Sequence, residues 1–547
     1  MRGGAGAACV LVLLVAAACG SSASTDEPEI ALADGGPDAP ATDARIDPID
    51  VALDSGSDAL HDAPVDARDG APEGGLPATV TPGAPDRILL FGTVVTPDVA
   101  FEGQVLVEGS LITCVAPALG CQGQVGAAGA TIIDTHGVIA PGLVDTHNHI
   151  LFDIFDDTDW LPLQAYTNHK DWTTEVRYQA MLDVKQCLED ASQGKPTWCP
   201  ATYDGVNNLK CEMDKWGELK GMIAGTTSIV GLAGTTSACF GSLARTIDAS
   251  QNGLAQDKIQ TSALFPPSRS AADGVCANFA SLKTEAYLIH VGEGTDLPAL
   301  HEFAKLGTVP TTENCLYAPQ TTITHGTAFG ANEFTQMAAA GMKLTWSPAS
   351  NVALYGATTN IPAALDANVT IALAPDWSMG GSQNLLDEMR FADAWDDAHF
   401  GNRLTPRSIV AMTTKNAAAA LALTGRIGTI AVGALADLMV VTRNHADPFA
   451  SIVAARPKDV RLTMIGGRVL YGDAALKAAA PAAPGCEDLP ICGAPKFLCV
   501  AEASATAKLD QTFTQIKSIL EAALTDVDTL TPDGYDFAPL APLVKCD

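Results

Sequence analysis

Two histidines stand one residue apart in the segment Gly142–His149, directly after an apolar run that ends at Pro141. The β-branched and apolar residues here predict a strand, whose alternate side chains share a face, so His147 and His149 point the same way. Neutral imidazole is the commonest metal ligand, and three protein ligands with one water form a catalytic rather than a structural zinc site. The pair alone also allows another interpretation, with one histidine in the core and the other on the surface.

Three later strand-like runs also end in a residue that can bind a metal ion. They are Ala286–His290, Thr321–His325 and Thr370–Asp376. All three are short, β-branched and apolar, as buried parallel strands are. In an eight-stranded βα barrel the carboxyl ends of the strands meet at one face, where the active site lies. The sequence therefore predicts an α/β protein with a TIM (β/α)8 barrel and one shared site for these side chains.

Further motifs follow in a defined order along the chain. They are the opening PGLVDTHNH, His290-Val-Gly-Glu293 as an HxxE, His325-Gly326, a PxSN pattern in residues 346–351, Pro375-Asp376, and the segments 385–389, 425–430 and 433–438. In this order they resemble the amidohydrolase superfamily, in the branch of cytosine deaminase, chlorohydrolase and thioadenosine/adenosylhomocysteine deaminase-like enzymes. The resemblance covers about residues 87–473.

The resemblance implies a division of the chain into a barrel and a flanking β domain. The barrel is expected over residues 140–424, with its second, third and fourth strands at 225–230, 242–247 and 258–264. Residues 87–139 and 425–475 are expected to pair as a composite β-sandwich beside it. Within the barrel, residues 152–204 form an insertion with several aromatics, expected to cap the mouth. Those aromatics either line a pocket or pack the loop.

By carry-over from mononuclear members of the family, the metal ligands are His147, His149, His290 and Asp376. Three nitrogens and one carboxylate suit Zn²⁺ first and Fe²⁺ second, since ligand type alone does not separate the two. Binuclear relatives bridge two metals with a carboxylated lysine at the end of the fourth strand. The candidate here, Lys258, lies at the start of that run, so one divalent metal ion is expected.

The same resemblance implies roles for the remaining polar residues. Asp376 accepts a proton from the attacking water, Glu293 shuttles a proton to the leaving nitrogen, and His325 stabilises developing charge. Ser350 and Asn351 are expected to brace the loop after the seventh strand. Three histidines without a matching motif are expected on the surface, namely His169, His301 and His399.

The predicted activity is hydrolysis of a non-peptide C–N bond in a small molecule, an amide, cyclic amide or amidine, through a metal-activated water. Trp377 follows Asp376 where the deaminases carry small residues, which favours this broad class over nucleobase deamination. Two alternatives remain open. One is a catalytically inactive cell-surface protein that binds a small molecule on the same barrel, and the other is a binuclear dipeptidase-like amidohydrolase.

The first 80 residues carry export signals rather than a fold. Arg2, the apolar run 10–15 and small residues before Cys19 are typical of a bacterial lipoprotein signal peptide, residues 1–19, with Cys19 lipidated. Residues 20–80 are rich in Asp, Ala and Pro and predict a disordered tether that holds much of the net charge of −31. The chain is therefore expected to be exported and lipid-anchored to the cell envelope, at the outer membrane. A periplasmic or secreted protein is the alternative.

This acidic balance argues against nucleic acid as a partner. The expected partners are a small-molecule substrate and, through Cys19, a membrane, while a homo-oligomer is left open.

Cysteine usage agrees with export. The chain has 14 cysteines, and without Cys9 and Cys19 an even number remains, as disulfides require. Cys114 and Cys121 are the best single pair. Local pairs are also expected among three cysteines of the region 187–211 and among four of the C-terminal extension 480–547. No CxxC pair exists, which disfavours a cysteine zinc site. In the extension, residues 503–524 predict an amphipathic helix on the barrel.

Overall fold

The computed structural model describes residues 75–190, 194–231, 243–247, 259–262, 265–482, 485–530 and 536–546. The predicted signal peptide, Cys19 and the tether before residue 75 lie outside the described residues. Among the residues described, no helix is long and apolar enough to cross a membrane.

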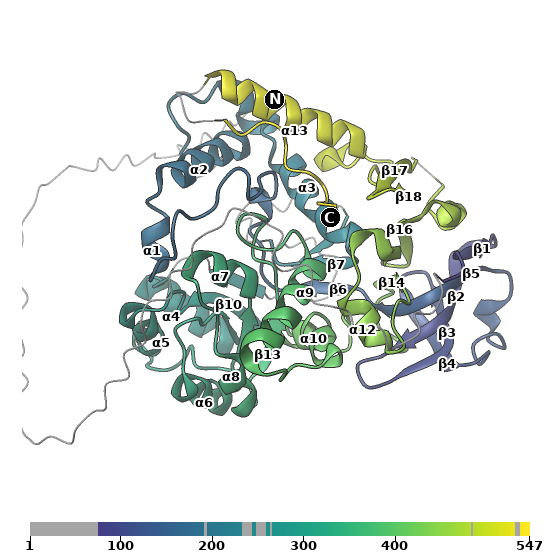
Figure 1. Cartoon of the computed structure of the whole chain (residues 1–547), viewed down its shortest axis with the longest axis horizontal. Helices are drawn as coiled ribbons and strands as arrows, with labels where there is room; N and C mark the ends of the chain where they lie inside the picture. The colour runs from purple at the N-terminus through teal and green to yellow at the C-terminus, as the bar shows by residue number, and fades with distance from the viewer. Residues whose placement is uncertain are drawn as a thin grey trace, which may run out of the picture. The chain divides into compact units, whose positions relative to one another are not determined.

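In the described residues, two sheets of parallel strands occupy the middle of the chain, with helices beside them (Figure 1). Three form one sheet, in the order β6 (Leu143–Asp145), β7 (Thr226–Ile229) and β8 (Arg245–Thr246). Five form a second sheet, in the order β13 (Thr370–Leu373), β12 (Lys343–Trp346), β11 (Thr321–His325), β10 (Ala286–Val291) and β9 (Ile259–Ser262). The strands predicted at 225–230, 242–247 and 258–264 are thus observed as β7, β8 and β9.

A parallel bridge between Asn148 and Asp376 joins the two sheets just beyond the ends of their first and last strands. His149 N donates to Asp376 O at 2.7 Å, and Asp376 N donates to His147 O at 3.2 Å. β10 and β11 are buried along their whole length, as their apolar sequences require. The first and last strands therefore meet at their carboxyl ends, where the predicted ligands lie.

Helices follow most of these strands. They are α3 (Lys210–Ile223), α4 (Arg269–Ala280), α5 (Leu297–Thr308), α6 (Ala331–Ala340), α7 (Pro348–Tyr355), α8 (Ile361–Asp366), α9 (Leu385–Trp395), α10 (Pro406–Met412) and α11 (Lys415–Ala420). α7 matters most for the site: it begins at Pro348, whose fixed φ suits a first helical turn, and ends before Gly356 at φ 65°. Pro348 and Gly356 therefore set the two ends of the short helix that carries Ser350, Asn351 and Tyr355.

The segments that flank the barrel region pair in one mixed ten-stranded sheet. Its order is β17 (Glu487–Ile491), β18 (Ala494–Leu498), β16 (Arg468–Asp473), β15 (Val460–Ile465), β14 (Leu438–Thr442), β5 (Ala130–Pro141), β2 (Ala84–Val95), β3 (Ala100–Glu108) and β4 (Leu111–Pro117), with β1 (Thr79–Thr81) on β5. β5 and β14 are antiparallel neighbours, so the predicted pairing of N- and C-terminal segments is observed. Hydrogen bonds connect all ten strands into one sheet, and the strand order alone does not divide this sheet into the two layers of a sandwich.

Several boundaries differ from the prediction. The predicted tether ends too late, since β1 at Thr79–Thr81 already pairs with β5, and β17 and β18 carry the flanking sheet into the predicted C-terminal extension. Ala140 and Pro141 belong to β5 in the flanking sheet, not to the barrel region. Gly142 then makes the transition to β6, and a Cβ at Gly142 would collide with the Thr227 side chain. The C-terminal helix α13 spans Phe513–Leu530, so its predicted start near residue 503 was wrong. It packs on α3, where Phe513 stacks on Trp216 with ring centroids 6.0 Å apart.

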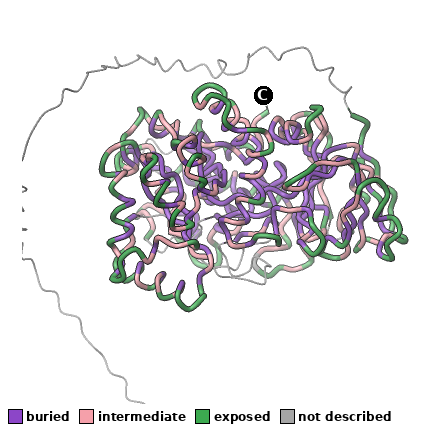
Figure 2. The backbone as a smooth tube through the Cα atoms, turned by 90° about the horizontal axis from the view of Figure 1, so that it is seen from below, coloured by how far each residue is buried: buried purple, intermediate pink, exposed green. Residues whose placement is uncertain are grey.

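Disulfides fasten several peripheral segments. Cys114–Cys121 is present as predicted, and the predicted local pairs are Cys187–Cys199, Cys486–Cys499 and Cys492–Cys546. Cys276–Cys315 was not anticipated from the sequence. Buried residues are concentrated in the interior, and exposed residues lie mainly at the periphery (Figure 2).

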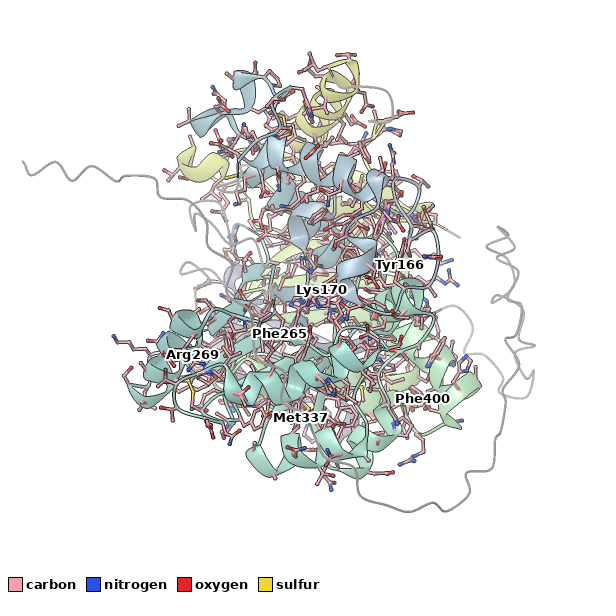
Figure 3. All side chains as sticks on the ribbon, turned by 90° about the vertical axis from the view of Figure 1, so that its left-hand side faces the viewer. Tyr166, Lys170, Phe265, Arg269, Met337 and Phe400 are labelled. Carbon is pink, nitrogen blue, oxygen red and sulfur yellow. A yellow bond between two sulfur atoms is a disulfide. The ribbon has the colours of Figure 1, made fainter. Side chains whose placement is uncertain are left out.

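The insertion contributes α1 (His169–Trp172) and α2 (Val176–Glu189). Figure 3 shows it from the side, with Tyr166 and Lys170 labelled. Tyr166 donates a 2.6 Å hydrogen bond to Glu175, which also accepts from Trp160 Nε1 at 2.8 Å and from the backbone N of Leu163 at 2.9 Å. Glu175 therefore holds the insertion together from within.

Candidate metal and catalytic site

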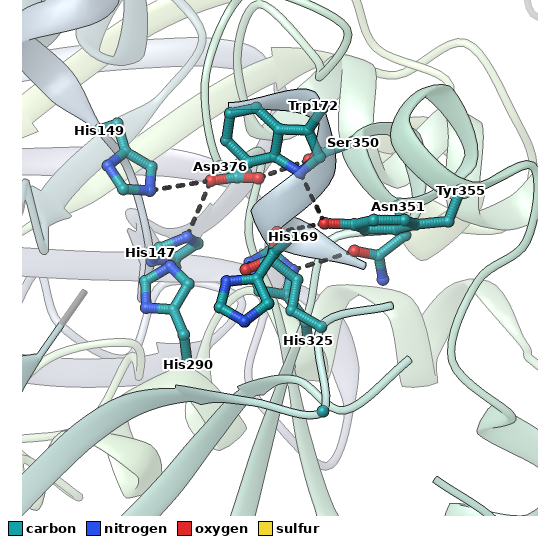
Figure 4. A network of polar contacts seen from close by, with 12 residues as sticks. His147, His149, His169, Trp172, His290, His325, Ser350, Asn351, Tyr355 and Asp376 are labelled. Atoms are coloured by element: carbon teal, nitrogen blue, oxygen red, sulfur yellow. Dashed lines mark hydrogen bonds and ion pairs between the residues drawn. The ribbon is translucent and has the colours of Figure 1, made fainter. Parts of the chain in front are cut away.

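The four predicted metal ligands converge at the carboxyl ends of β6, β10 and β13 (Figure 4). His147 Nε2 lies 2.8 Å from Asp376 Oδ1, and His149 Nε2 lies 3.5 Å from the same oxygen. One ligand atom from each of His147, His149 and His290 lies within 4.8 Å of the others. Side chains separated by long stretches of sequence therefore meet at one point.

The backbone is unusual at two of these strand ends. Asp376 has φ 71° and His325 has φ 70°, in the left-handed region that side chains with a Cβ rarely adopt. Such strained residues cluster at functional sites, where surrounding contacts hold them. Here the bridge to Asn148 holds Asp376, and Thr359 Oγ1 donates to His325 O at 2.6 Å. The turn at each strand end directs the side chain into the cluster.

The donor atoms fit a divalent cation. His147 Nε2 and Asp376 Oδ1 are buried and have no hydrogen-bond partner, although they lie 2.8 Å apart. Buried polar atoms without partners are rare in folded proteins, and a shared cation would satisfy both. His290 Nδ1 lies 3.1 Å from Ser262 O, a carbonyl that can only accept, so Nδ1 carries the proton and Nε2 keeps its lone pair.

The electrostatics keep these groups in their metal-binding forms. Burial, and then the neighbouring imidazoles, hold the pKa of His290 well below its ordinary value. Burial likewise lowers the pKa of His149 to about 3. For Asp376, burial alone would raise the pKa, but the nearby His147 and the other imidazoles outweigh it and leave the pKa below its ordinary value. His149 and His290 are therefore neutral and the Asp376 carboxylate is ionised at neutral pH.

Glu293 and His325 border this cluster. His325 Nε2 lies 3.9 Å from Glu293 Oε2, and His325 Nδ1 lies 2.9 Å from Asn351 Oδ1. Because an amide oxygen only accepts, Nδ1 of His325 carries the hydrogen in that contact. Ser350 Oγ donates to Asp376 Oδ2. Ser350 and Asn351, expected only to brace a loop, thus contact site residues directly.

Of the three histidines predicted to lie on the surface, two are exposed and one is not. His301 and His399 are exposed, although His399 stacks on Trp395 with ring centroids 3.9 Å apart. The prediction for His169 was wrong: its ring is only 16 % exposed and its Nε2 lies 3.0 Å from Glu302 Oε1. No motif marks this contact, because the two residues are 133 positions apart in the chain.

Buried aromatic residues cover the cluster. Trp377 lies 5.6 Å from His149 between ring centroids, and 5.4 Å and 5.7 Å from Trp172 and Trp160 of the insertion. Phe152 contacts both His149 and Trp377, at 6.3 Å and 6.0 Å. Trp377 thus stands beside the site as the sequence indicated, and Trp160 and Trp172 pack against it.

Two residues of the site were missed by sequence reasoning. Tyr355 Oη donates to Glu293 Oε1 at 2.7 Å. Glu388, which lies within the motif 385–389, accepts from Ala349 N at 3.2 Å and from Ser382, and burial raises its pKa to about 8. A buried carboxyl on a helix leaves a weak sequence signal, since the same pattern also describes an exposed one.

Comparison with known proteins agrees with this geometry. The amidohydrolase family matches residues 138–470. A 5′-deoxyadenosine deaminase of Methanothermobacter thermautotrophicus is 26% identical over 406 residues, which cover 69% of this chain and 91% of the relative. A 5-methylthioadenosine/S-adenosylhomocysteine deaminase of Haloarcula marismortui is 25% identical over 364 residues, covering 62% of this chain and 82% of the relative.

Two solved structures share the fold. One is an adenosine deaminase from Xanthomonas campestris with bound zinc, with a TM-score of 0.53 and 17% identity over 71% of this chain and 93% of that one. The other is the atrazine chlorohydrolase TrzN of Arthrobacter aurescens in complex with zinc, with a TM-score of 0.54 and 15% identity over 73% and 97%. With the family match over more than half its length, the chain belongs to the amidohydrolase family and is a hydrolase of carbon–nitrogen bonds.

Proposed function

We propose that the protein hydrolyses a non-peptide C–N bond of a small molecule at a single divalent cation held by His147, His149, His290 and Asp376. The convergence of these four side chains, with Glu293 and His325 beside them, carries the proposal. We also propose that the eight parallel strands close into a TIM barrel, which the bridge between Asn148 and Asp376 supports. The flanking ten-stranded sheet then folds over as a composite sandwich.

Zinc is the first choice for this site and iron(II) the second, because three imidazoles and a carboxylate suit both. A cation of this kind lowers the pKa of a bound water from about 15.7 to about 7, which supplies hydroxide at neutral pH. Lys258, the candidate for a carboxylated lysine, lies outside the described residues. A single metal ion remains the proposal, and metal stoichiometry distinguishes it from a binuclear site.

The side chains then move the protons. Asp376 accepts one proton from water as the water oxygen bonds to the sp² carbon, while His325 stabilises the charge that develops there. Glu293 then takes this proton from Asp376 and gives it to the nitrogen as the C–N bond breaks. Water thereby supplies OH to the carbon and H to the leaving amine or ammonia. Such acid–base help accelerates reactions by about 10² to 10⁴.

The substrate class is an amide, cyclic amide or amidine, including aminated heterocycles. Relatives named as deaminases of 5′-deoxyadenosine and 5-methylthioadenosine support the last group. Trp377 and its aromatic neighbours provide flat apolar surface beside His149, which suits a planar substrate. A surface protein that only binds such a ligand has no need for Glu293, and this disfavours the inactive alternative.

Metal analysis and a substrate screen test the proposal together. Purified protein should contain about one zinc or iron per chain, and a screen of amides, lactams, hydantoins and aminated heterocycles should release ammonia or amine. His147→Ala should lose both metal and activity. His301→Ala, which alters an exposed histidine, is the matched control and should keep both. Retention of metal and turnover by His147→Ala would refute the assignment.

We further propose that the protein is exported and anchored through a lipid on Cys19. Disulfides such as Cys276–Cys315 support export, since such bonds persist outside the cytoplasm. Cys19→Ala should move the protein from the membrane fraction to the soluble fraction. A variant that stays with membranes would contradict the anchor, while secretion of the wild type would favour the periplasmic or secreted alternative.

A further inference from the structure

A chain of hydrogen bonds runs from the insertion to the carboxylate of Glu293. Trp172 Nε1 donates to Tyr355 Oη at 3.0 Å, and Tyr355 Oη donates to Glu293 Oε1 at 2.7 Å. Figure 4 shows the indole and the phenol joined by the first of these contacts. All three side chains are buried, with 5 to 7 % of their surface exposed. This series of hydrogen bonds is therefore shielded from bulk water along its length.

The chemistry of its members fixes the direction of this chain. An indole N–H can only donate, so Tyr355 Oη accepts from Trp172. The single phenolic hydrogen is then directed to Glu293 Oε1, which becomes a committed acceptor. Burial, and then the negative charge of Glu293, raise the pKa of Tyr355 well above its ordinary value, so the phenol stays protonated.

The second oxygen of Glu293 points elsewhere. Oε2 lies 3.9 Å from His325 Nε2, on the side of the imidazole cluster. One ligand atom from each of His290, Glu293 and His325 lies within 4.8 Å of the others. The two carboxylate oxygens therefore have different surroundings, one bound to a phenol and the other facing the reacting groups.

Backbone contacts tie the donor end of the chain to the loop that carries Glu293. His169 N donates to Glu293 O at 3.3 Å, and Thr295 N donates to Thr167 O at 2.8 Å. Asn168 forms an antiparallel bridge with Gly294 and donates from Nδ2 to Asp296 Oδ1 at 3.0 Å. Trp172 thus sits on a helix that is pinned to the same loop as the carboxylate.

We propose that Tyr355, supported by Trp172, is a positioning residue that occupies Oε1 of Glu293 and reserves Oε2 for the proton in transit. This inference rests on the proposed function, because it assumes that Glu293 protonates the leaving nitrogen. The phenol is not itself a proton carrier. Its role is to hold one rotamer of the carboxylate and to decide which oxygen reacts.

The test compares Tyr355→Phe with the wild type, both loaded with zinc. The variant keeps the ring and removes only the hydroxyl. Its crystal structure should show the Glu293 carboxylate rotated from its wild-type position. With the compound that the screen identifies, 5′-methylthioadenosine being tried first, kcat should fall at least about tenfold, part of the 10² to 10⁴ that an acid–base group supplies. KM should change less than about twofold. This split distinguishes a loss of positioning from a structural defect, which would alter both kcat and KM.

Trp172→Phe and the double variant complete a cycle. Trp172→Phe should lower kcat less than Tyr355→Phe, and the double variant should match Tyr355→Phe, because the indole acts through the phenol. Tyr317→Phe is the matched control, since Tyr317 Oη also donates a partly buried hydrogen bond, 2.6 Å to Phe303 O, away from the site. It should leave kcat unchanged.

The outcomes separate the two proposals. An unmoved carboxylate, or a kcat within about twofold of wild type in Tyr355→Phe, overturns this inference. If Glu293→Gln retains full turnover, the proposed function of Glu293 fails and the inference fails with it. If Glu293→Gln abolishes turnover while Tyr355→Phe does not alter it, only the inference fails.

Discussion

Ser350 Oγ donates a hydrogen bond to Asp376 Oδ2, while Oδ1 of the same carboxylate lies 2.8 Å from His147 Nε2. One carboxylate oxygen is thus fixed by a hydroxyl on α7 and the other is directed at the imidazoles. Partners of this kind orient a ligand and set its affinity for metal.

We expect Ser350→Ala to weaken zinc binding by about 10- to 100-fold, since loss of such a partner usually has that effect. Competition with a chelator measures the change directly. Ser281→Ala removes an exposed hydroxyl that donates to the backbone carbonyl of Ala277. This control variant should bind zinc as the wild type does. Equal zinc affinity in Ser350→Ala and wild type would contradict the role of Ser350.

Glu388 should make the stability of the metal-free protein depend on pH. Burial raises its folded pKa from 4.5 to about 8, so between these values the folded state holds a proton that the unfolded state has lost. Stability contributed by the neutral carboxyl is present below about pH 4.5 and is lost as pH rises through 8. Glu388→Gln should remove this loss.

Thermal unfolding of the metal-free protein between pH 5 and about 8 checks this sign. The difference in Tm between Glu388→Gln and wild type should shift in favour of the variant as pH rises. Glu333→Gln alters a carboxylate that accepts a hydrogen bond from Gly330 N at the start of α6, and it serves as the reference for the general effect of charge removal. A difference that is constant with pH would show that Glu388 is ionised in the folded protein.

The disulfides should differ in their effect on stability according to the length of chain they close. Cys276–Cys315 closes a separation of 39 residues and Cys114–Cys121 one of 7. Loop entropy predicts losses of about 4 and about 2 kcal/mol when each pair is replaced by alanine. Denaturant unfolding of the two double variants measures the order, and the reverse order would show that native contacts, not the unfolded chain, dominate.

Trp377 should limit the size of substrate beside His149. Trp377→Ala removes a buried indole that contacts Trp160 and Trp172, so it should destabilise the protein by about 3 to 5 kcal/mol. The same change should raise kcat/KM for bulky aminated heterocycles relative to small amides. Ratios of kcat/KM across the substrate screen check this, and an unchanged ratio would place Trp377 outside the substrate path.

The ligand cluster could be predicted because each ligand ends a short apolar run, and parallel strands bring their ends together. His147, His149, His290 and Asp376 all follow this rule. The contact of Tyr355 with Glu293 could not be predicted, because it depends on the direction of a side chain at the last residue of a helix. No periodicity encodes that direction.

The errors at element boundaries have a similar physical cause. The apolar run through Ala140 and Pro141 continues without a break from the flanking sheet towards β6, so hydrophobicity does not mark where one sheet ends. The position of α13 depends on stacking of Phe513 against Trp216, a contact across almost 300 residues. Cys276–Cys315 likewise joins residues whose distance in space is set by the fold.

The bridge between Asn148 and Asp376 has a consequence for biogenesis. About 230 residues separate His147 from Asp376, so a ribosome must synthesise about two thirds of the chain before the last ligand exists. Contacts of such long sequence separation form late and slowly. The complete set of four ligands is therefore assembled only after these distant segments have come together.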